Sequence, residues 1–207
     1  MINRNYQREL DNLTAGFLHE GRVPSLLLHS CCAPCSSYVL EYLSEYFNIT
    51  VLYYNPNISS EEEYNLRLSE QERLINEMDL KNPVSLISEQ YNPAEFYEIA
   101  KGLEKCPERG ERCHKCYRLR LEHTAHIAKE QGYDYFATTL TLSPLKDATV
   151  LNAIGEELAD KYDVSYLVSD FKKKDGYKRS IELSKEYGLY RQSFCGCIFS
   201  KVASDFK

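Results

Sequence analysis

The sequence lacks the features of a membrane-spanning or secreted protein. None of its apolar stretches approaches the roughly 20 residues that a transmembrane helix needs, and the polar start MINRNYQREL has neither the basic nor the apolar region of a secretory signal. Internal repeats, low-complexity segments and linkers are also missing. With 207 residues, 43% of them hydrophobic, we expect a single cytoplasmic domain over residues 1–207 with one continuous core and no membrane partner.

A uniformly basic surface is missing too, because the net charge is -6. Basic residues nevertheless gather in two groups, which solvated helix faces and phosphate contacts explain equally well. The first group comprises Arg109, Arg112, Lys115, Arg118 and Arg120, and the second comprises residues 172–174 with Lys178 and Arg179. The composition therefore leaves binding to a nucleic acid open.

Cysteine, by contrast, is abundant and clustered. The eight cysteines stand at positions 31, 32, 35, 106, 113, 116, 195 and 197. A disulfide framework would spread them along the chain. In a reducing compartment, clusters of this kind indicate metal binding or thiol redox chemistry.

Strand-like and helix-like patterns alternate along the chain. We expect strands at 25–30, 49–57, 83–89, 134–142 and 165–170, and helices at 36–47, 59–79, 92–104, 113–131, 146–162 and 177–188. Such alternation predicts an α/β fold with a mainly parallel sheet flanked by helices. Functional sites in these folds lie at the carboxyl ends of the strands, and HSCCAPCSS (29–37) directly follows the first strand. Ser36 or Ser37 is expected to cap the next helix.

Two cysteine motifs have the chemistry of a metal site. Cys113 and Cys116 of CHKC project from one face at the start of a predicted helix, whose amino end and nearby basic residues favour thiolates. The motif CCAPC (31–35) offers further thiols on a turn that Pro34 stiffens. The thiols outnumber the ligands of one tetrahedral zinc, and iron-sulfur clusters tolerate irregular spacing. An iron-sulfur cluster is therefore favoured, with zinc binding and metal-free packing as alternatives.

The third motif, FCGCIF, separates Cys195 from Cys197 by a single glycine. A disulfide across so small a ring departs from relaxed geometry, and strained disulfides are the reducible, catalytic ones. The alternative is a pair of free buried thiols. Cys106, in a proline-containing loop, is expected to be incidental.

Two polar residues near predicted strand ends have alternative roles. His29 either donates a hydrogen bond to a substrate or is a satisfied strand-end histidine. Asp147 either caps the helix that follows it or supplies an oxygen ligand to a second metal ion.

Taken together, LLLHSCCAPCSS, YYNPNI, ERCHKCYRLRLEHTAHIA, TTLTLSPLKD and RQSFCGCIFS resemble the QueH family of epoxyqueuosine reductases. The resemblance covers about residues 25–200 and leaves residues 1–24 as an N-terminal extension. It implies an adenine nucleotide α-hydrolase-like fold. It also implies the conversion of epoxyqueuosine to queuosine at the wobble position of tRNA, by two-electron removal of the epoxide oxygen.

The resemblance also assigns roles to the cysteines. It implies that a 4Fe-4S cluster is held by Cys31, Cys32, Cys113 and Cys116, without cobalamin. Cys195 and Cys197 match a redox-active pair in the same family.

For Cys35 and Asp147 the resemblance suggests binding of an additional mononuclear iron or contact with the epoxide. The implied partners are the anticodon arm of tRNA, held by the basic groups with Tyr117 stacking on a flipped base, and an external electron donor. The cysteine loop after the first strand replaces the loop that cradles phosphate in nucleotide-binding relatives, which predicts loss of nucleotide hydrolysis. Two other functions stay open: an ATP-dependent tRNA-modifying sulfur transferase of the same fold, and a non-catalytic zinc-containing RNA-binding module.

Overall fold

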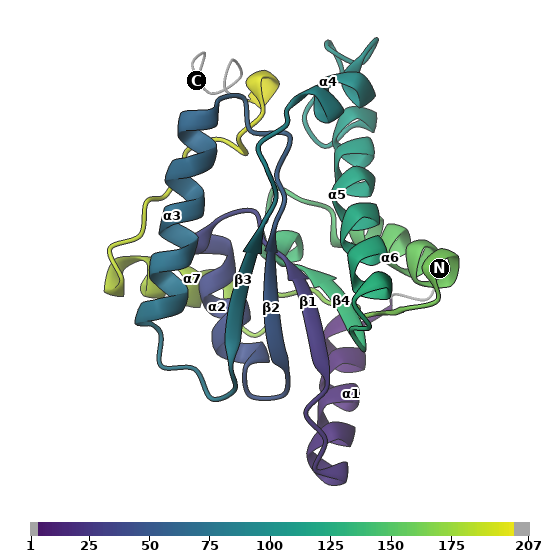
Figure 1. Cartoon of the computed structure of the whole chain (residues 1–207), viewed down its shortest axis with the longest axis vertical. Coiled ribbons are helices and arrows are strands. Elements are labelled where there is room, and N and C mark those ends of the chain that lie inside the picture. The colour runs from purple at the N-terminus through teal and green to yellow at the C-terminus, as the bar shows by residue number, and fades with distance from the viewer. Residues whose placement is uncertain (1–3, 201–207) are drawn as a thin grey trace.

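The computed structural model describes residues 4–200 (Figure 1). Its centre is a five-stranded sheet with the order β3-β2-β1-β4-β5, in which all four neighbouring pairs are parallel. The strands are β1 (Ser25–His29), β2 (Asn48–Tyr53), β3 (Val84–Ser88), β4 (Tyr135–Thr138) and β5 (Ser165–Tyr166). The expected α/β architecture with a mainly parallel sheet is confirmed.

Helices cover both faces of this sheet, so its central strands are apolar on both sides. The helices are α1 (Tyr6–Glu20), α2 (Ala33–Leu43), α3 (Glu61–Glu77), α4 (Ala94–Ala100), α5 (Glu111–Glu130), α6 (Ala148–Tyr162) and α7 (Gly176–Glu186). Leu26 and Leu28 of β1 pack in one core cluster with α1, α2 and α7. Leu27 faces the other way, toward α5 and α6.

Helix α1 had no counterpart in the sequence prediction, which treated residues 1–24 as an extension. The side chain of Asn5 accepts a hydrogen bond from the amide of Arg8 at the start of the helix, and Gly21 ends it in the left-handed conformation. Leu10 and Phe17 are buried, and the Phe17 ring lies 5.5 Å from that of Phe47. The extension therefore contributes to the core that supports the first strand.

The start of α2 differs from the prediction in a way that matters for the site. The helix begins at Ala33 rather than at residue 36, with extended Cys32 at its N-cap and Pro34 in its first turn. Ser36 and Ser37 lie inside the helix, where their hydroxyls donate to the backbone oxygens of Cys32 and Pro34. The expected serine cap is wrong, and the cysteine motif itself forms the first turn.

The fourth and fifth strands are shorter than expected. The hydroxyl of Thr138 accepts a hydrogen bond from the amide of Leu140 and turns the chain into a short 3-10 helix, η1 (Thr139–Leu142). Strand β5 has only two residues and ends before Leu167. The polypeptide therefore leaves both strands early at the carboxyl edge of the sheet, which opens space there. Between residues 4 and 200 no helix combines the length and apolarity needed to cross a bilayer.

Candidate functional site

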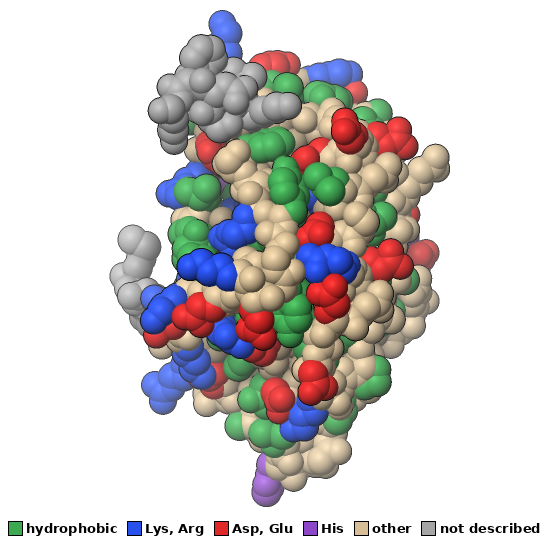
Figure 2. All heavy atoms as spheres, turned by 90° about the vertical axis from the view of Figure 1, so that its left-hand side faces the viewer, with side chains coloured by type: hydrophobic (Ala, Val, Ile, Leu, Met, Phe, Trp, Pro, Cys, Tyr) green, Lys and Arg blue, Asp and Glu red, His purple; other side chains and the backbone are tan. Residues whose placement is uncertain are grey.

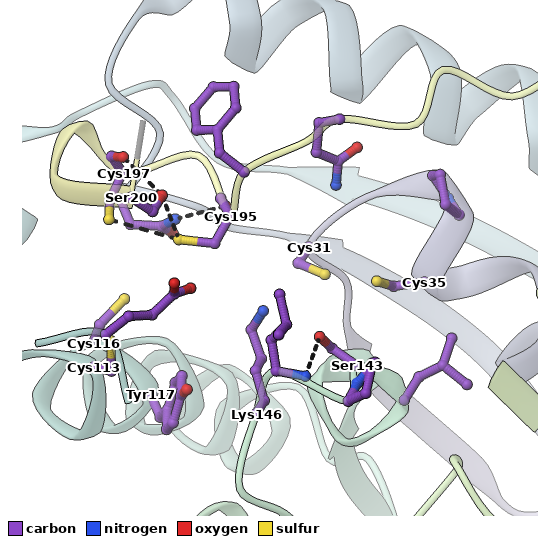
Figure 3. A pocket seen from close by; sticks show the side chains of 18 of the residues that line it. Cys31, Cys35, Cys113, Cys116, Tyr117, Ser143, Lys146, Cys195, Cys197 and Ser200 are labelled. Carbon is purple, nitrogen blue, oxygen red and sulfur yellow. Dashed lines mark hydrogen bonds between the residues drawn. The ribbon is translucent and has the colours of Figure 1, made fainter. Parts of the chain in front are cut away.

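A cavity of about 290 Å³ lies at the carboxyl ends of the strands. We call it the thiol cavity, because six of its lining residues are cysteines: Cys31, Cys35, Cys113, Cys116, Cys195 and Cys197. They come from the start of α2, the start of α5 and the tail after α7. Figure 3 shows these three groups on separate walls, with Lys146 extending between them. The fold thus brings all three sequence motifs to one place.

The first wall holds a compact sulfur triad. The Sγ atoms of Cys31, Cys32 and Cys35 all lie within 4.8 Å of one another, and those of Cys31 and Cys32 are 3.7 Å apart. Neighbouring side chains on an extended strand point in opposite directions. Here the turn from β1 into α2 brings both toward the same place, and Cys35 follows one helical turn later.

Hydrogen bonding within the triad favours one thiolate, at Cys31, and two neutral thiols, at Cys32 and Cys35. Donation by Cys32 and Cys35 holds the pKa of Cys31 well below its ordinary value. The bond to Cys31 raises the pKa of Cys32 to about 11, and that of Cys35 also rises. One thiolate with two thiol donors is a natural precursor for metal binding, which displaces the remaining protons.

The second wall is the first turn of α5. The amide of Arg109 donates to the Sγ atom of Cys113 at 3.3 Å, and Cys116 is buried. Burial raises the pKa of both thiols in the metal-free chain. It outweighs the Arg109 amide and the Arg112 charge, which lower the pKa of Cys113 in the expected direction. Arg112 points to the backbone oxygens of the preceding loop, and Lys115 pairs with Glu111.

The third wall is the tail. The Sγ atoms of Cys195 and Cys197 are 3.6 Å apart, and the Ser200 hydroxyl lies 3.2 Å from the Cys195 sulfur. Donation by Cys197 holds the pKa of Cys195 well below its ordinary value and raises that of Cys197. Both thiols are free, and a modest movement would bring the sulfurs to disulfide distance. The arrangement suits a reversible dithiol.

The charges around the cavity fit an anionic metal-thiolate group. Five cations line it: Arg67, Arg112, Arg120, Lys146 and Arg191. Arg120 is only 3% exposed and donates to the Cys116 backbone oxygen and the Asn55 side chain, not to a carboxylate. The Lys146 ammonium makes no hydrogen bond or ion pair with any residue from 4 to 200, although its backbone amide donates to the Ser143 oxygen. Buried cations need a nearby anion, and the thiolates of a bound metal centre would provide it.

Lys146 and Arg67 were missed by the sequence analysis. Burial alone would lower the pKa of Lys146, but the negative charges of Cys31 and Cys195 raise it, so its ammonium stays charged. Its position in the strand-end segment SPLKD was the available signal. Arg67 lies within the polar helix α3, and nothing in the local pattern distinguishes it.

The two polar residues near strand ends do not line the thiol cavity. His29 is fully buried and bonds through Nδ1 to the Thr138 hydroxyl at 2.9 Å and through Nε2 to the Tyr54 oxygen at 3.2 Å. It is therefore a satisfied strand-end histidine. Asp147 caps α6 by accepting from the amides of Thr149 and Val150. Metal binding by Asp147 stays a prediction.

The two basic groups are largely occupied within the protein. Arg109 donates to the backbone oxygens of Pro144 and Leu145. Carboxylates pair with Arg118, Lys172, Lys174 and Arg179. On the α3 side of the molecule, Figure 2 shows basic and acidic side chains next to one another rather than a continuous basic surface. Tyr117 lines the cavity but is only 4% exposed, which leaves little ring surface for stacking on a base.

Comparison with known proteins gives close relatives. A family model described as epoxyqueuosine reductase QueH matches residues 26–203. A protein of that name from Staphylococcus epidermidis is 44% identical, over 98% of this chain and 88% of the relative. Another, from Streptococcus pyogenes, is 42% identical over 95% of this chain and 78% of the relative.

A solved structure supports the fold. The U34-tRNA thiolase NcsA from Methanococcus maripaludis, with its 4Fe-4S cluster, matches with a TM-score of 0.54 and 13% sequence identity. The match covers 96% of this chain and 71% of the thiolase. At this identity the likeness concerns the fold alone, and it confirms the expected adenine nucleotide α-hydrolase-like arrangement.

Proposed function

Because the chain belongs to the QueH family of epoxyqueuosine reductases, we propose that the thiol cavity is the place where it removes the epoxide oxygen. The chain is an oxidoreductase that forms queuosine from epoxyqueuosine in tRNA. The single observation that carries the proposed site is the meeting of three cysteine motifs, distant in sequence, around one cavity. Neither the sulfur transferase nor the zinc module accounts for this family membership.

The proposed ligands of a 4Fe-4S cluster are Cys31, Cys32, Cys113 and Cys116. Three of them, Cys31, Cys113 and Cys116, line the cavity, and the Cys32 sulfur lies 3.7 Å from that of Cys31. The cations of the lining that lack carboxylate partners add support. Such a cluster transfers electrons singly, and an exposed iron acts as a Lewis acid toward oxygen. Cys35 completes the triad and is the better supported ligand for an additional iron, since the Asp147 carboxylate already caps α6.

Cys195 and Cys197 are proposed to hold the two electrons that the reaction consumes. Oxidation of the two thiols to a disulfide releases two electrons and two protons. The epoxide takes up both, leaving an alkene and water, so the reaction balances. An external electron donor then reduces the disulfide. The proximity of the two sulfurs and the opposite shifts of their pKa values support this role.

The substrate is proposed to be the anticodon arm of tRNA. The thiols line a cavity at the strand ends, and Cys116 and Cys197 are buried in its walls, so a nucleotide that stays stacked within the anticodon loop does not reach them. The wobble nucleoside must therefore turn out of the anticodon loop to enter, as unpaired RNA bases do in many complexes. Exposed Tyr177 and Arg191 at the lining are better placed than buried Tyr117 to contact neighbouring nucleotides.

The test is anaerobic incubation of the metal-loaded enzyme with epoxyqueuosine-containing tRNA and a reductant, followed by mass analysis of the nucleosides. The wild type should convert epoxyqueuosine to queuosine. Cys195→Ala should retain the metal but stop repeated turnover. Cys106→Ser is the matched control, because Cys106 does not line the cavity, and it should remain active. A metal-loaded wild type that forms no queuosine would contradict the proposal.

A further inference from the structure

Among residues 4–200, five cationic side chains line the thiol cavity but only one carboxylate does. That carboxylate belongs to Glu108. Glu108 is exposed and lies in the loop between α4 and α5. Within the same part of the chain, no hydrogen bond or ion pair engages its side chain. The carboxylate is thus free to bind a group that enters from outside.

The loop that carries Glu108 is held in place on both sides. Arg112 donates from Nη1 to the backbone oxygens of Leu103, Glu104 and Cys106 at 2.8, 3.0 and 2.6 Å. Arg109 follows Glu108 with a left-handed φ of 69°. Its guanidinium donates to the oxygens of Pro144 and Leu145, which tie the loop to the segment before α6. These contacts fix the backbone beside the carboxylate.

The chemistry of the substrate supplies a partner for this carboxylate. Epoxyqueuosine is a 7-deazaguanosine whose aminomethyl nitrogen joins the base to the epoxycyclopentane ring. That nitrogen is a secondary amine, protonated at neutral pH, on the carbon next to the epoxide. Arg112, Arg120 and Lys146 would repel its positive charge unless a negative group stood close by. The thiolates are the other negative groups of the cavity, but the metal they ligate and the cations beside them engage that charge. Among the lining residues this leaves the Glu108 carboxylate as the negative group without a partner.

We propose that Glu108 binds the secondary ammonium of epoxyqueuosine and thereby places the epoxide against the thiol-lined wall. This inference rests on the proposed function and names the subsite that selects a cationic 7-deazaguanine over unmodified guanine. A charged hydrogen bond from the secondary ammonium to Glu108 positions the epoxide-bearing ring, and it does not involve the epoxide oxygen that reacts.

The test measures binding rather than turnover. Two anticodon stem-loops carry 7-aminomethyl-7-deazaguanosine or its neutral isostere, 7-ethyl-7-deazaguanosine, at the wobble position. Neither contains an epoxide, so neither can be reduced. The metal-loaded wild type should bind the aminomethyl RNA about tenfold more tightly, as expected for one charged hydrogen bond. Glu108→Gln should bind both RNAs equally.

Glu104→Gln is the matched control, because Glu104 is an exposed carboxylate of the same loop that does not line the cavity. It should keep the tenfold preference. Equal binding of the two RNAs by the wild type, or a preference that survives in Glu108→Gln, would overturn the inference. The same wild-type preparation is assayed for reduction of epoxyqueuosine. Reduction without charge preference refutes the Glu108 subsite alone, whereas charge preference without reduction refutes the proposed function and leaves the subsite standing.

Discussion

Arg67 donates from Nη1 to the backbone oxygen of Cys195 at 3.3 Å, which joins the middle of α3 to the tail that carries the dithiol. Its side chain is 2% exposed, its Nε donates to Glu63 at 2.7 Å, and its guanidinium lies 5.3 Å from the Phe194 ring centre. The amide of Ser59 also donates to the Gly196 oxygen at 3.0 Å. The dithiol therefore has a fixed place in the cavity although it lies outside any helix or strand.

Replacing Arg67 by Ala should release this tail. The substitution leaves the Glu63 carboxylate with only the Tyr190 hydroxyl as a donor, and the Cys195 oxygen with only the Asn57 amide at 3.5 Å. Loss of the buried guanidinium should cost about 3 kcal/mol in the free energy of unfolding. Alkylation of Cys197, which is 5% exposed, should become several-fold faster. Urea denaturation and peptide mapping after iodoacetamide treatment measure both effects. Arg73→Ala, on the exposed side of the same helix, should cost no more than about 1 kcal/mol in the free energy of unfolding. An equal loss of stability in the two variants would show that Arg67 does not hold the tail in place.

Position 196 requires glycine because of its backbone conformation and because neighbouring side chains lie close to it. Its φ is 111°, and an added Cβ would lie 3.1 Å from both the Arg67 Nη1 and the Ile58 Cγ1 atoms. Gly196→Ala should displace the dithiol and lower turnover by about tenfold or more, since such backbone strain costs about 1–3 kcal/mol. Gly132→Ala introduces a similar positive φ, 73°, in open space away from the cavity. Steady-state rates should fall only in the first variant, and unchanged turnover in Gly196→Ala would speak against a fixed dithiol.

The two tail thiols should differ in reactivity. Cys197 donates to Cys195 and keeps the pKa of Cys195 low, with the Lys146 charge adding to the effect. Cys197→Ala removes the donor, so the pKa of Cys195 rises and its alkylation at pH 7 slows by roughly tenfold, because the thiolate is the nucleophile. Rates of iodoacetamide labelling across a pH series measure this, in the metal-free chain. Faster or unchanged labelling of Cys195 in that variant would show that Cys197 does not activate it.

His29 should make the fold sensitive to acid. Burial, with a further contribution from Arg120, lowers the pKa of His29 from 6.5 to about 3. Below pH 6.5 the unfolded chain binds a proton that the folded chain excludes. The stability due to neutral His29 is therefore complete above pH 6.5 and is lost as the pH falls toward 3, by about 2 kcal/mol at pH 5.

His29→Gln removes the titrating ring while its amide can still donate to the Tyr54 oxygen. Its free energy of unfolding should fall less between pH 7 and pH 5 than that of the wild type, by about 2 kcal/mol. Denaturation at the two pH values gives the comparison. Identical losses in both proteins would mean that other groups cause the acid sensitivity.

Local patterns predicted the sheet and the three cysteine motifs but not how the motifs meet. The run Leu26–Leu28 is buried on both faces, so its apolar character marked the first strand directly. The start of α2 was misplaced because Cys32 occupies the N-cap without a capping side chain, whereas serine is the usual signal. Arg67 could not be found because its partner, Cys195, is 128 residues away and only tertiary structure joins them. Lys146 was not predicted because its neighbour Asp147 has carboxylate oxygens, the kind of group that binds metals, whereas a lysine in a polar segment is usually solvated.

The iron and acid-labile sulfide content of the chain purified without oxygen tests most directly whether distant cysteines share one iron-sulfur centre. We predict about four sulfides and four to five irons per chain in the wild type and in Cys106→Ser, the fifth iron being the additional one at Cys35. Cys113→Ser should lose the sulfides and the four cluster irons. Stoichiometric zinc in place of iron, or a full iron and sulfide content in Cys113→Ser, would contradict the account.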